Sequence, residues 1–365
     1  MTDPSMYDFA VVGVGPAGAR FARQAADRGH RVIAFEQGAI GRPLACSGHV
    51  STDIYRYLPP GAAGRLRQNE ISAARFHVGG PDSPGHRFYR EETISVVIDR
   101  VGLDKVLADA ATAAGADVRT HHTVTTVTPS PQGVAVEVQA PDGMLQVRAR
   151  MVVGADGPTS RTRRALGIDP PGELLHGVLG FDPTPDAADH VDVHLIVPGF
   201  FAWRIPRGDA GVEYGIAGTP GADLRLRFDR LLAAYDVSLS DRCSGAIPIG
   251  PPPSTVGERG LVVGDAAAQT KPFTGGGILY GIQAADIAAA AIDPTDPGTL
   301  RRYGRRWRRA LGREVRVGGG VRRAYDLPRP LQRLGLRILA GELGVHMDRP
   351  TSLFSGRNLR RLLGL

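Results

Sequence analysis

The spacing of apolar and polar positions predicts a strand, a helix and a second strand at the start of the chain. Residues 7–12 form a short apolar run, residues 17–29 place apolar side chains at helical intervals, and residues 31–36 form another apolar run. The glycine-rich turn GVGPAG, residues 13–18, joins the first strand to the helix. Together these elements predict one βαβ unit of a parallel sheet.

Further along the chain, the pattern predicts a second type of sheet. Residues 101–115 are helical in period, and the β-rich stretch 118–153 is broken at SPQG and PDG, both of which favour turns. Residues 171–254 contain short strand-like runs such as VDVHLIV, FFAWRIP and GVEYGIAG, which indicate an antiparallel sheet. The segment LVVGD, residues 261–265, returns to the pattern of a buried strand and leads into a helix after Gly275–Gly277.

The last part of the chain predicts two helices. One apolar stripe at helical spacing consists of Leu300, Tyr303, Trp307, Leu311 and Val315. Arginines occupy the other faces, so this helix is amphipathic. Pro328 and Pro330 interrupt the pattern, and a second helix is predicted around residues 331–338.

The positive charge of the protein is concentrated in this tail. Residues 300–365 carry 17 arginines and 4 acidic residues, a net charge of +13, whereas residues 1–299 carry −6. A basic segment of this kind suits nucleic acid, anionic lipid or a solvated face without a partner. No nucleic-acid-binding fold or aromatic stacking platform accompanies it, and the acidic body would repel a phosphate backbone. We therefore expect no nucleic acid partner.

Length and composition exclude several other classes. With 365 residues and 42% hydrophobic content, the chain can form about two or three units with real cores, so it is neither disordered nor fibrous. Two cysteines, Cys46 and Cys243, build neither a disulfide framework nor a zinc site. The N-terminus lacks the basic start of a signal peptide, and Asp286 interrupts the longest apolar stretch, residues 282–292. A cytoplasmic protein without a spanning helix is expected.

The glycine turn of the first βαβ unit has the chemistry of a dinucleotide site. Gly13 permits the tight turn, Gly15 lets the backbone approach a pyrophosphate at the helix N-terminus, and Gly18 lets the helix pack on the strand. Glu36 ends the second strand, where a carboxylate accepts hydrogen bonds from ribose hydroxyls and repels a 2′-phosphate. NADP is therefore a poor candidate for this pocket.

Two later motifs decide between NAD and FAD. The string VVGADGPTSRTR matches the pattern aDGxxSxxR through Asp156 and Gly157, and a Gly-Asp pair ends at Asp265. With the first motif, they resemble the flavoprotein group that includes para-hydroxybenzoate hydroxylase, over about residues 7–300. The resemblance implies an α/β fold with a Rossmann-like FAD-binding domain, an inserted antiparallel-sheet substrate domain and FAD as the cofactor.

The same resemblance assigns residues to the cofactor. It implies that Asp265 binds the ribityl and pyrophosphate region, that the helix after Gly275–Gly277 is aimed at the isoalloxazine, and that Arg100 contacts FAD. A helix N-terminus can stabilise the negative charge of reduced flavin. The expected FAD-binding residues are Gly13, Gly15, Pro16, Ala17, Gly18, Glu36, Ala45, Cys46, Gly48, Arg100, Val124, Asp156, Gly157, Asp265, Gly275, Gly276, Gly277 and Ile278.

Three segments are similar to the geranylgeranyl reductase family, which includes archaeal digeranylgeranylglycerophospholipid reductases. PLACSGHVS, residues 43–51, resembles the family's loop in which a cysteine and a glycine lie near the flavin. PGFFAWRIP, residues 198–206, resembles PxxYxWxFP, with Phe201 and Ile205 in place of the tyrosine and the phenylalanine. KPFTGGGILYG, residues 271–281, resembles the family's segment almost residue for residue. The two departures leave the exact lipid open.

This family resemblance implies the saturation of isolated C=C bonds in the geranylgeranyl chains of archaeal-type ether lipids. Such an alkene has no carbonyl to polarise, so the site must deliver a proton as well as a hydride from N5 of reduced FAD. We expect Trp203 to line an apolar tunnel, where its π face could stabilise positive charge on a substituted carbon. We expect Cys46 to position the alkene or supply the proton, and Cys243 to pack in the core.

Other interpretations of the motifs stay open at this point. An FAD-dependent aromatic hydroxylase shares the cofactor motifs but acts on small polar aromatics. A flavin halogenase has a similar string to FAWRIP but needs a lysine early in the chain, and neither Lys105 nor Lys271 stands at such a place. A non-enzymatic isoprenoid carrier that resembles the Rab escort proteins would have decayed cofactor motifs, and all the motifs are intact here.

The predicted organisation has three parts. They are an FAD-binding domain of residues 1–72, 92–170 and 255–299, a substrate domain of residues 73–91 and 171–254, and a basic helical segment of residues 300–365. The expected partners are an isoprenoid lipid and a reduced electron donor, either NAD(P)H or a ferredoxin-like protein. We expect the helix around Trp307 to pack inward, to hold the protein peripherally at the inner face of the cell membrane through anionic lipid, or to do both, with its apolar stripe inward and its arginines outward.

Overall fold

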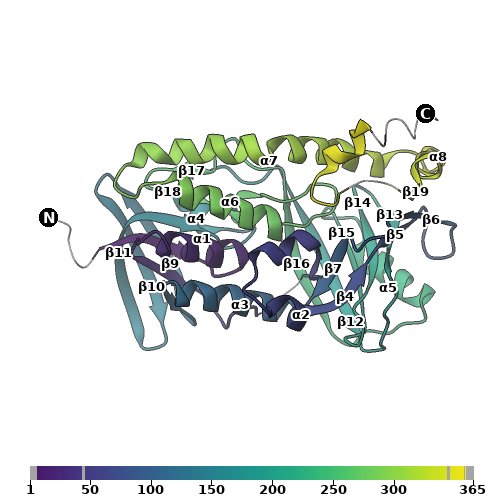
Figure 1. Cartoon of the computed structure of the whole chain (residues 1–365), viewed down its shortest axis with the longest axis horizontal. Helices are drawn as coiled ribbons and strands as arrows, with labels where there is room; N and C mark the ends of the chain where they lie inside the picture. The colour runs from purple at the N-terminus through teal and green to yellow at the C-terminus, as the bar shows by residue number, and fades with distance from the viewer. Residues whose placement is uncertain (1–5, 43–45, 343–345, 357, 359–365) are drawn as a thin grey trace.

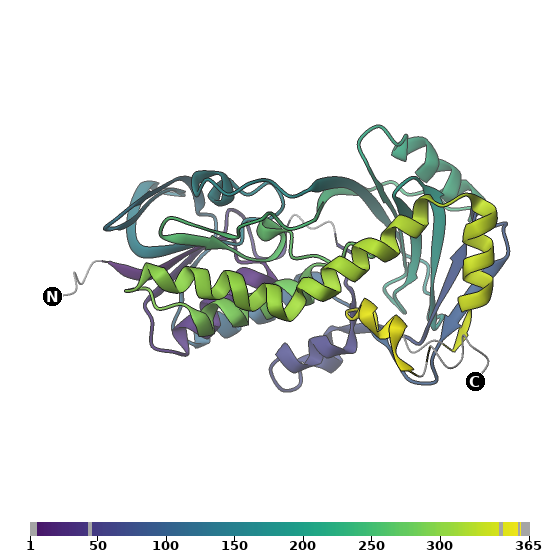
Figure 2. The same cartoon turned by 90° about the horizontal axis from the view of Figure 1, so that it is seen from above.

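The computed structural model describes residues 6–42, 46–342, 346–356 and 358. Two large sheets lie one after the other along the long axis of the molecule, and one long helix crosses both of them (Figure 1). The view from above shows the same helix running from one half to the other (Figure 2).

The first sheet is built on the predicted βαβ unit. Its order is β17-β18-β11-β1-β2-β8, and β1 is parallel to both of its neighbours. β9 and β10 pair in an antiparallel meander with β11, with turns at the predicted SPQG and PDG sequences. The strands are β1 (Tyr7–Val12), β2 (Val32–Phe35), β8 (Asp117–Arg119), β9 (Thr123–Ser130), β10 (Gly133–Ala140), β11 (Gly143–Gly154), β17 (Val256–Gly257) and β18 (Gly260–Val262).

Both faces of β1 are covered, which explains its continuous apolar sequence. Phe9 and Val11 pack under the helices α1 (Pro16–Ala26), α3 (Arg100–Ala113) and α6 (Ile278–Ala291), while Ala10 and Val12 belong to the cluster under the meander. Small residues let α6 approach α1 closely: a Cβ on Gly281 would lie 3.2 Å from Cβ of Ala17. The predicted helix after the second glycine cluster is thus confirmed.

The second sheet collects strands from distant parts of the chain. Its order is β16-β12-β15-β14-β13-β5-β6-β19, and β13 is parallel to β5, with Val193 opposite Phe76. The strands are β5 (Ala73–His77), β6 (Gly85–Tyr89), β12 (Glu173–Asp182), β13 (His190–Val197), β14 (Phe200–Pro206), β15 (Val212–Gly218), β16 (Arg242–Ile249) and β19 (Gly341–Glu342). The expected antiparallel sheet is present, because β12 is antiparallel to both β15 and β16, and β14 is antiparallel to both β13 and β15. The fold class is confirmed.

Smaller elements complete the two halves. A three-stranded sheet has the order β3-β7-β4, and α5 packs on β13 and β15 of the second sheet. These elements are β3 (His49–Ser51), β4 (Arg67–Ile71), β7 (Ser95–Ile98), α2 (Ala62–Leu66), α4 (Arg161–Ala165), α5 (Leu224–Ala234) and the short 3₁₀ helix η1 (Thr52–Tyr57).

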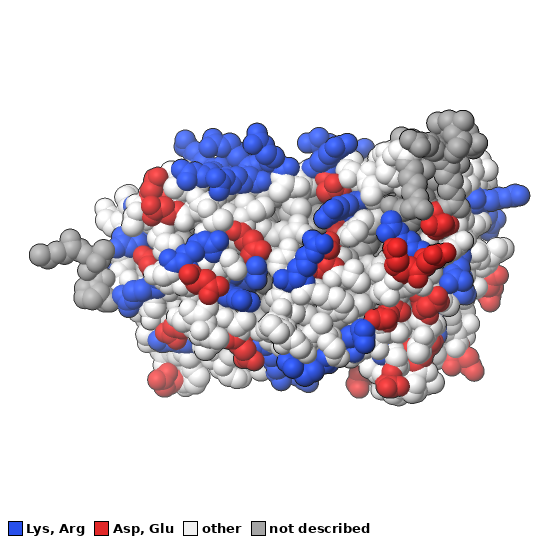
Figure 3. Space-filling model, in the orientation of Figure 1, with Lys and Arg blue, Asp and Glu red and all other residues white. Residues whose placement is uncertain are grey.

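The tail forms the two predicted helices, α7 (Leu300–Arg323) and α8 (Arg329–Leu339). The apolar stripe of α7 packs inward: Trp307 is 1% exposed, and its Nε1 donates a hydrogen bond to Oγ1 of Thr255 over 2.9 Å. Basic side chains cover the outer surface of α7 (Figure 3). The stripe is therefore directed inward and the arginines outward, and membrane contact through those arginines stays a prediction.

After α8 the chain turns back toward the centre of the molecule. β19 pairs with β6, and the 3₁₀ helix η5 (Pro350–Phe354) packs against α7. The sequence pattern did not predict this return. Within the described residues, no helix is both long enough and apolar enough to cross a bilayer.

The burial of Trp307 predicts a large effect on stability. Trp307→Ala removes a buried indole between α7 and the first sheet, and we expect it to lower the free energy of unfolding by about 3–5 kcal/mol. Chemical denaturation followed by circular dichroism measures this. Trp307→Phe, which keeps a ring but loses the hydrogen bond to Thr255, should cost clearly less. A loss below about 1 kcal/mol for Trp307→Ala would contradict inward packing.

Candidate active site

A cavity of about 900 Å³ lies between the two large sheets. One wall consists of the loops that follow β1, β11 and β18, where the carboxyl ends of neighbouring parallel strands meet. In α/β proteins this edge is the usual place for a ligand. The opposite wall comes from β13, β14 and β16, and the returning tail closes one side with Met347, Asp348 and Pro350.

Glycine suits each of the three positions in the first turn for a different structural reason. Gly13 has φ +92°, and a Cβ there would lie 2.4 Å from the carbonyl oxygen of Ala155. A Cβ on Gly18 would lie 2.0 Å from the oxygen of Gly13, so α1 could not pack so closely with any other residue. Gly15 differs, because a Cβ there would meet nothing within 4 Å and would point into free space at the start of α1. Gly15, Pro16 and Ala17 line the cavity.

Asp265 presents its carboxylate to the cavity at the place where the sequence predicts the ribityl chain of FAD. Its carboxylate faces the cavity beside the start of α6, where a Cβ on Gly277 would lie 2.4 Å from Oδ1. No donor among the described residues forms a hydrogen bond to it, and desolvation raises its pKa to about 6, although Arg100 acts in the opposite direction. Gly275, Gly276 and Ile278 line the same end of the cavity.

Arg100 lies beside this carboxylate and is also only partly satisfied. It is 5% exposed and forms an ion pair with Asp104, with N–O distances of 2.7 and 3.1 Å. Its Nε has no hydrogen-bond partner, and its guanidinium interacts electrostatically with Cys46. Arg100, Asp104 and Cys46 all line the cavity. Hydroxyl groups of a ribityl chain and phosphate oxygens would satisfy Asp265 and Arg100, so the residues present fit FAD.

The Asp156 motif supports the wall next to the glycine turn. Oδ1 of Asp156 accepts a hydrogen bond from Ser160 over 2.5 Å, and Oδ2 accepts two from Thr162 over 2.9 and 3.0 Å. Arg163 of the same motif donates to the carbonyl oxygens of Pro158 and Ala266 and so joins two cavity loops. The carboxylate of Asp156 therefore orders the turn, while Gly157 lines the cavity.

Some predicted residues are not brought to the cavity wall. Glu36 accepts a hydrogen bond from the amide of Val14 over 2.9 Å at the end of β2, and Val124 packs in the core under the meander. Their contacts with FAD stay predictions. Gly48, two residues after Cys46, has φ +72° and approaches the backbone of Ile98. Ala45 lies outside the described residues.

Trp203 lines the cavity and is held by a group that sequence reasoning missed. Its Nε1 donates to Oε1 of Glu213 over 2.8 Å, and the indole lies over Gly215, its partner on β15. Glu213 is fully buried and also accepts from Arg207 over 3.2 Å. Arg207 in turn donates to the carbonyl oxygen of Ser47 over 2.6 Å. One buried carboxylate thus links the apolar wall to the loop that carries Cys46.

A third buried ion pair lies beside Gly276 at the cavity. Nζ of Lys271 lies 2.6 Å from Oδ1 of Asp348, and both residues are buried. Cε of Lys271 lies 2.8 Å from the position of a Cβ on Gly276, so the lysine runs along the predicted flavin-facing turn. Nearby, desolvation and the charge of Lys271 lower the pKa of His49 to about 4, which keeps this imidazole neutral near pH 7.

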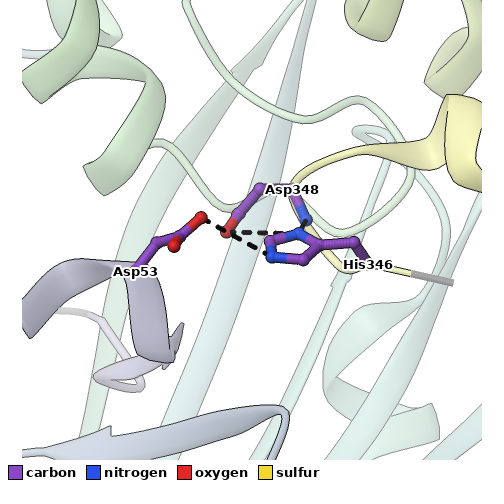
Figure 4. Close-up of side chains that lie close together, drawn as sticks. All are labelled: Asp53, His346 and Asp348. Atoms are coloured by element: carbon purple, nitrogen blue, oxygen red, sulfur yellow. Dashed lines mark hydrogen bonds and ion pairs between the residues drawn. The ribbon is translucent and has the colours of Figure 1, made fainter. Parts of the chain in front are cut away.

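The tail is also tied to the N-terminal half by a histidine. His346 lies between Asp53 of η1 and Asp348 (Figure 4), with Nε2 3.5 Å from the Asp53 carboxylate. Its Nδ1 accepts a hydrogen bond from the amide of Asp348, so in the neutral ring Nε2 carries the hydrogen and has no lone pair for a metal ion. These three side chains therefore connect the returning tail to η1 through non-covalent contacts.

Two signals in the sequence could have indicated the buried groups Glu213 and Lys271. Glu213 is a single charge in the otherwise apolar run GVEYGIAG, and Lys271 is one of only two lysines. Nothing in the sequence indicates that Asp348 returns to Lys271, because they are far apart along the chain. Cys243 is exposed on β16, so the expectation that it packs in the core is wrong.

The comparisons with known proteins agree with this geometry. Residues 6–198 match the FAD binding domain family. Digeranylgeranylglycerophospholipid reductase 2 from Methanopyrus kandleri is 32% identical over 337 residues, which cover 84% of this chain and 83% of that protein. The chain belongs to the digeranylgeranylglycerophospholipid reductase family. It is an FAD-dependent oxidoreductase, and the predicted enzyme class and cofactor are confirmed.

Solved structures agree at the level of the fold. A geranylgeranyl bacteriochlorophyll reductase-like protein from Thermoplasma acidophilum superposes with a TM-score of 0.87 at 23% identity, over 99% of this chain and 98% of that chain. The anhydrotetracycline hydroxylase from Streptomyces rimosus gives a TM-score of 0.66 at 20% identity, over 99% and 76% of the two chains. The hydroxylase and the similarly distant halogenases are therefore similar to this enzyme at the level of the fold.

The open space at Gly15 predicts a selective loss of cofactor. In Gly15→Ala the new methyl group meets no protein atom, so the chain should fold normally but a pyrophosphate could not approach. We expect the Kd for FAD to rise at least about tenfold, which is about 1.4 kcal/mol. Fluorescence titration of the apoprotein measures this. Gly64→Ala, another glycine with free space but away from the cavity, is the matched control and should bind normally. Normal FAD binding by Gly15→Ala would contradict the assignment.

Glu213 predicts a pH dependence of stability. Burial raises its pKa to about 7, against the opposing effects of Arg207 and of the Trp203 hydrogen bond. The folded protein therefore holds a proton that the unfolded chain releases near pH 4.5. The resulting stability is present at low pH and is lost as the pH rises through 7.

Glu213→Gln tests this prediction, because glutamine can still accept from Trp203 but does not ionise. Between pH 4.5 and 8 the wild type should lose up to about 3 kcal/mol more than the variant. Urea denaturation at several pH values measures the two slopes, and other titrating groups cancel in the difference. Parallel slopes would show that Glu213 is ionised at neutral pH or titrates normally.

Proposed function

We propose that this enzyme saturates isolated C=C bonds in the geranylgeranyl chains of digeranylgeranylglycerophospholipids. The supporting observation is the division of the cavity into a polar end and an apolar end. Charged groups gather beside Gly275–Gly277, whereas the walls from the second sheet are apolar. The apolar lining there includes Val191, Val193, Leu195, Phe200, Phe201, Ile205 and Ile247. The reductase name of the relative from Methanopyrus kandleri supports the same substrate class.

An apolar wall suits an isoprenoid chain better than a small polar aromatic. Hydroxylation substrates carry hydroxyl or carboxyl groups that need buried hydrogen-bond partners. Along β13, the side chains that line the cavity are Val191, Val193 and Leu195, while Asp192 and His194 are not part of the wall. A flexible chain of isoprene units requires contact area rather than donors, and this surface supplies it.

When bound and reduced, FAD supplies a hydride to one carbon of the alkene. The other carbon takes a proton, so the π bond is replaced by two C–H bonds. Cys46 lines the cavity, and Arg100 interacts with its thiol. A neighbouring guanidinium stabilises the thiolate that remains after a proton is transferred, and this favours Cys46 as the proton donor.

We propose that Trp203 stabilises the positive charge that develops on the substrate. Protonation before hydride transfer leaves partial positive charge on the more substituted carbon, and the face of an indole attracts such charge. The hydrogen bond to Glu213 and the contact with Gly215 hold the indole in one orientation in the cavity wall. A fixed electron-rich face costs no reorganisation during the reaction.

The enzyme needs an external reductant and a way to reach its lipid. We propose that the flavin is reduced either by NAD(P)H, which delivers two electrons as a hydride, or by a reduced ferredoxin-like protein, which delivers two electrons in successive one-electron transfers. We also propose that the enzyme works as a peripheral protein at the inner face of the cell membrane, where its substrate is found. The outward arginines of the tail support attraction to anionic lipid.

An anaerobic assay tests the function. The holoenzyme is reduced with dithionite, mixed with detergent-dispersed digeranylgeranylglycerophospholipid, and the lipid is analysed by mass spectrometry. We expect mass gains in steps of two hydrogens, and reoxidation of the flavin at the same rate. Replacing dithionite with NADPH, NADH or reduced ferredoxin identifies the donor. An unchanged lipid mass with fully reduced enzyme would refute the proposed function.

The two cysteines provide a matched pair of variants. Cys46→Ser replaces the thiol with a much weaker acid, so we expect kcat to fall at least about tenfold, a barrier increase of about 1.4 kcal/mol, with normal FAD content. Cys243→Ser changes an exposed residue on β16 and should leave kcat unchanged. If Cys46→Ser turns over at the wild-type rate, the proton comes from another group.

A further inference from the structure

Exposed apolar side chains gather on and beside α8. Leu331, Leu334 and Ile338 are 51%, 53% and 60% exposed, and Leu327 just before the helix is 44% exposed. At about 100° per residue Leu331, Leu334 and Ile338 fall on one stripe of the helix, and Leu327 lies just before its first turn. Among the described residues no other helix has more than one exposed large apolar side chain. This stripe, Leu327, Leu331, Leu334 and Ile338, is called the α8 stripe below.

The α8 stripe is continuous with the cavity. Leu327 and Leu331 are exposed and at the same time line the cavity, as does Tyr89 of β6. Leu336 and Leu339, on the inner side of the helix, line it as well. Apolar surface therefore extends without interruption from the proposed substrate wall to the outside of the molecule at α8.

Basic residues flank this stripe. Arg329, Arg333 and Arg337 are exposed and repeat every four residues along α8, which itself contains no acidic residue. The charges of Arg333 and Arg337 reach His86 on β6 and contribute to lowering its pKa. Apolar side chains beside a row of arginines are the pattern of a helix that lies in the interface of an anionic membrane.

The charge pattern also distinguishes a membrane from a second copy of the chain. A symmetric contact between two α8 helices would bring two rows of arginines close together and leave their charges unbalanced. Anionic head groups supply the opposite charge, and the acyl region accepts the apolar side chains. The observations therefore favour lipid as the occupant.

We propose that α8 docks the enzyme on an anionic bilayer and that the α8 stripe borders the portal through which the isoprenoid chain enters the cavity. This inference rests on the proposed function for the identity of the chain. Entry at the interface lets an apolar chain pass from lipid to the cavity wall without crossing water. The helix α7, suggested by its sequence as the membrane contact, has its apolar stripe buried and offers only charge.

Vesicle flotation tests the docking surface. The holoenzyme should float with phosphatidylglycerol-containing vesicles and not with phosphatidylcholine alone. Leu334→Ser/Ile338→Ser and Arg329→Gln/Arg333→Gln/Arg337→Gln should each weaken binding to the anionic vesicles at least tenfold. The change to serine alters exposed side chains that do not line the cavity, and FAD content checks folding.

Matched control variants come from the rest of the surface. Leu226→Ser removes an exposed leucine from α5, and Arg305→Gln/Arg306→Gln/Arg309→Gln removes three exposed arginines from α7. Leu226→Ser should bind anionic vesicles within about twofold of the wild type, and the α7 variant should lose clearly less affinity than the α8 arginine variant, because its charges are not accompanied by exposed apolar side chains. A loss in the α7 variant as large as in the α8 arginine variant would overturn the assignment to α8. A wild-type dimer that Leu334→Ser/Ile338→Ser dissociates would instead identify a second copy as the occupant.

Turnover separates this inference from the proposed function. With detergent-dispersed lipid, the turnover rate of Leu334→Ser/Ile338→Ser should lie within twofold of the wild-type rate. With lipid in anionic vesicles, this variant should turn over at least tenfold more slowly than the wild type. If the wild type reduces dispersed lipid but does not bind vesicles, the docking proposal is wrong and the function stands. If it binds vesicles through α8 but reduces no isoprenoid, docking stands and the proposed function is wrong.

Discussion

The structure depends on holding two independent sheets on opposite sides of one cavity, and α7 provides that constraint. Near its start, Trp307 is buried against the first sheet and bonded to Thr255. About 22 Å further along the helix, Arg322 forms two hydrogen bonds to Glu173 of β12 and a third to the carbonyl oxygen of Gly199. A rigid helix anchored at both ends keeps the cofactor edge of one sheet facing the apolar wall of the other.

The charged side chains that line the cavity gather at one end, where Lys271 is paired with Asp348 and Arg100 with Asp104. Glu213, behind Trp203 and outside the cavity lining, is paired with Arg207. Each of these buried groups thus has a specific partner. Asp265 is the exception, since no donor among the described residues reaches it and its pKa is raised to about 6. An unsatisfied carboxylate in a desolvated position is costly, and the hydroxyl groups of a bound flavin remove that cost.

The cofactor half could be predicted in detail because its signals are local. Gly13, Gly15 and Gly18 stand next to one another in sequence and in space, and the turn they form follows from backbone sterics alone. The same holds for Asp156, which orders the turn of residues 156–162. Glu213 and Asp348 were missed because their partners come from other strands or from the returning tail, and no periodicity records such pairings.

The amino-acid sequence by itself determined the βαβ unit, the antiparallel sheet, the amphipathic character of α7 and the presence of a helix at α8, because each of these depends on spacing within short segments. The assignment of FAD rested on the resemblance of the glycine and Gly-Asp motifs to those of known flavoproteins. Only the tertiary structure decided which apolar stripe is buried. Trp307 packs inward because the first sheet leaves an apolar face that α7 covers, whereas Leu334 and Ile338 stay exposed because β6 meets only the inner side of α8. A helical pattern indicates that one face of a helix is apolar, but what that face contacts depends on elements far away in the chain.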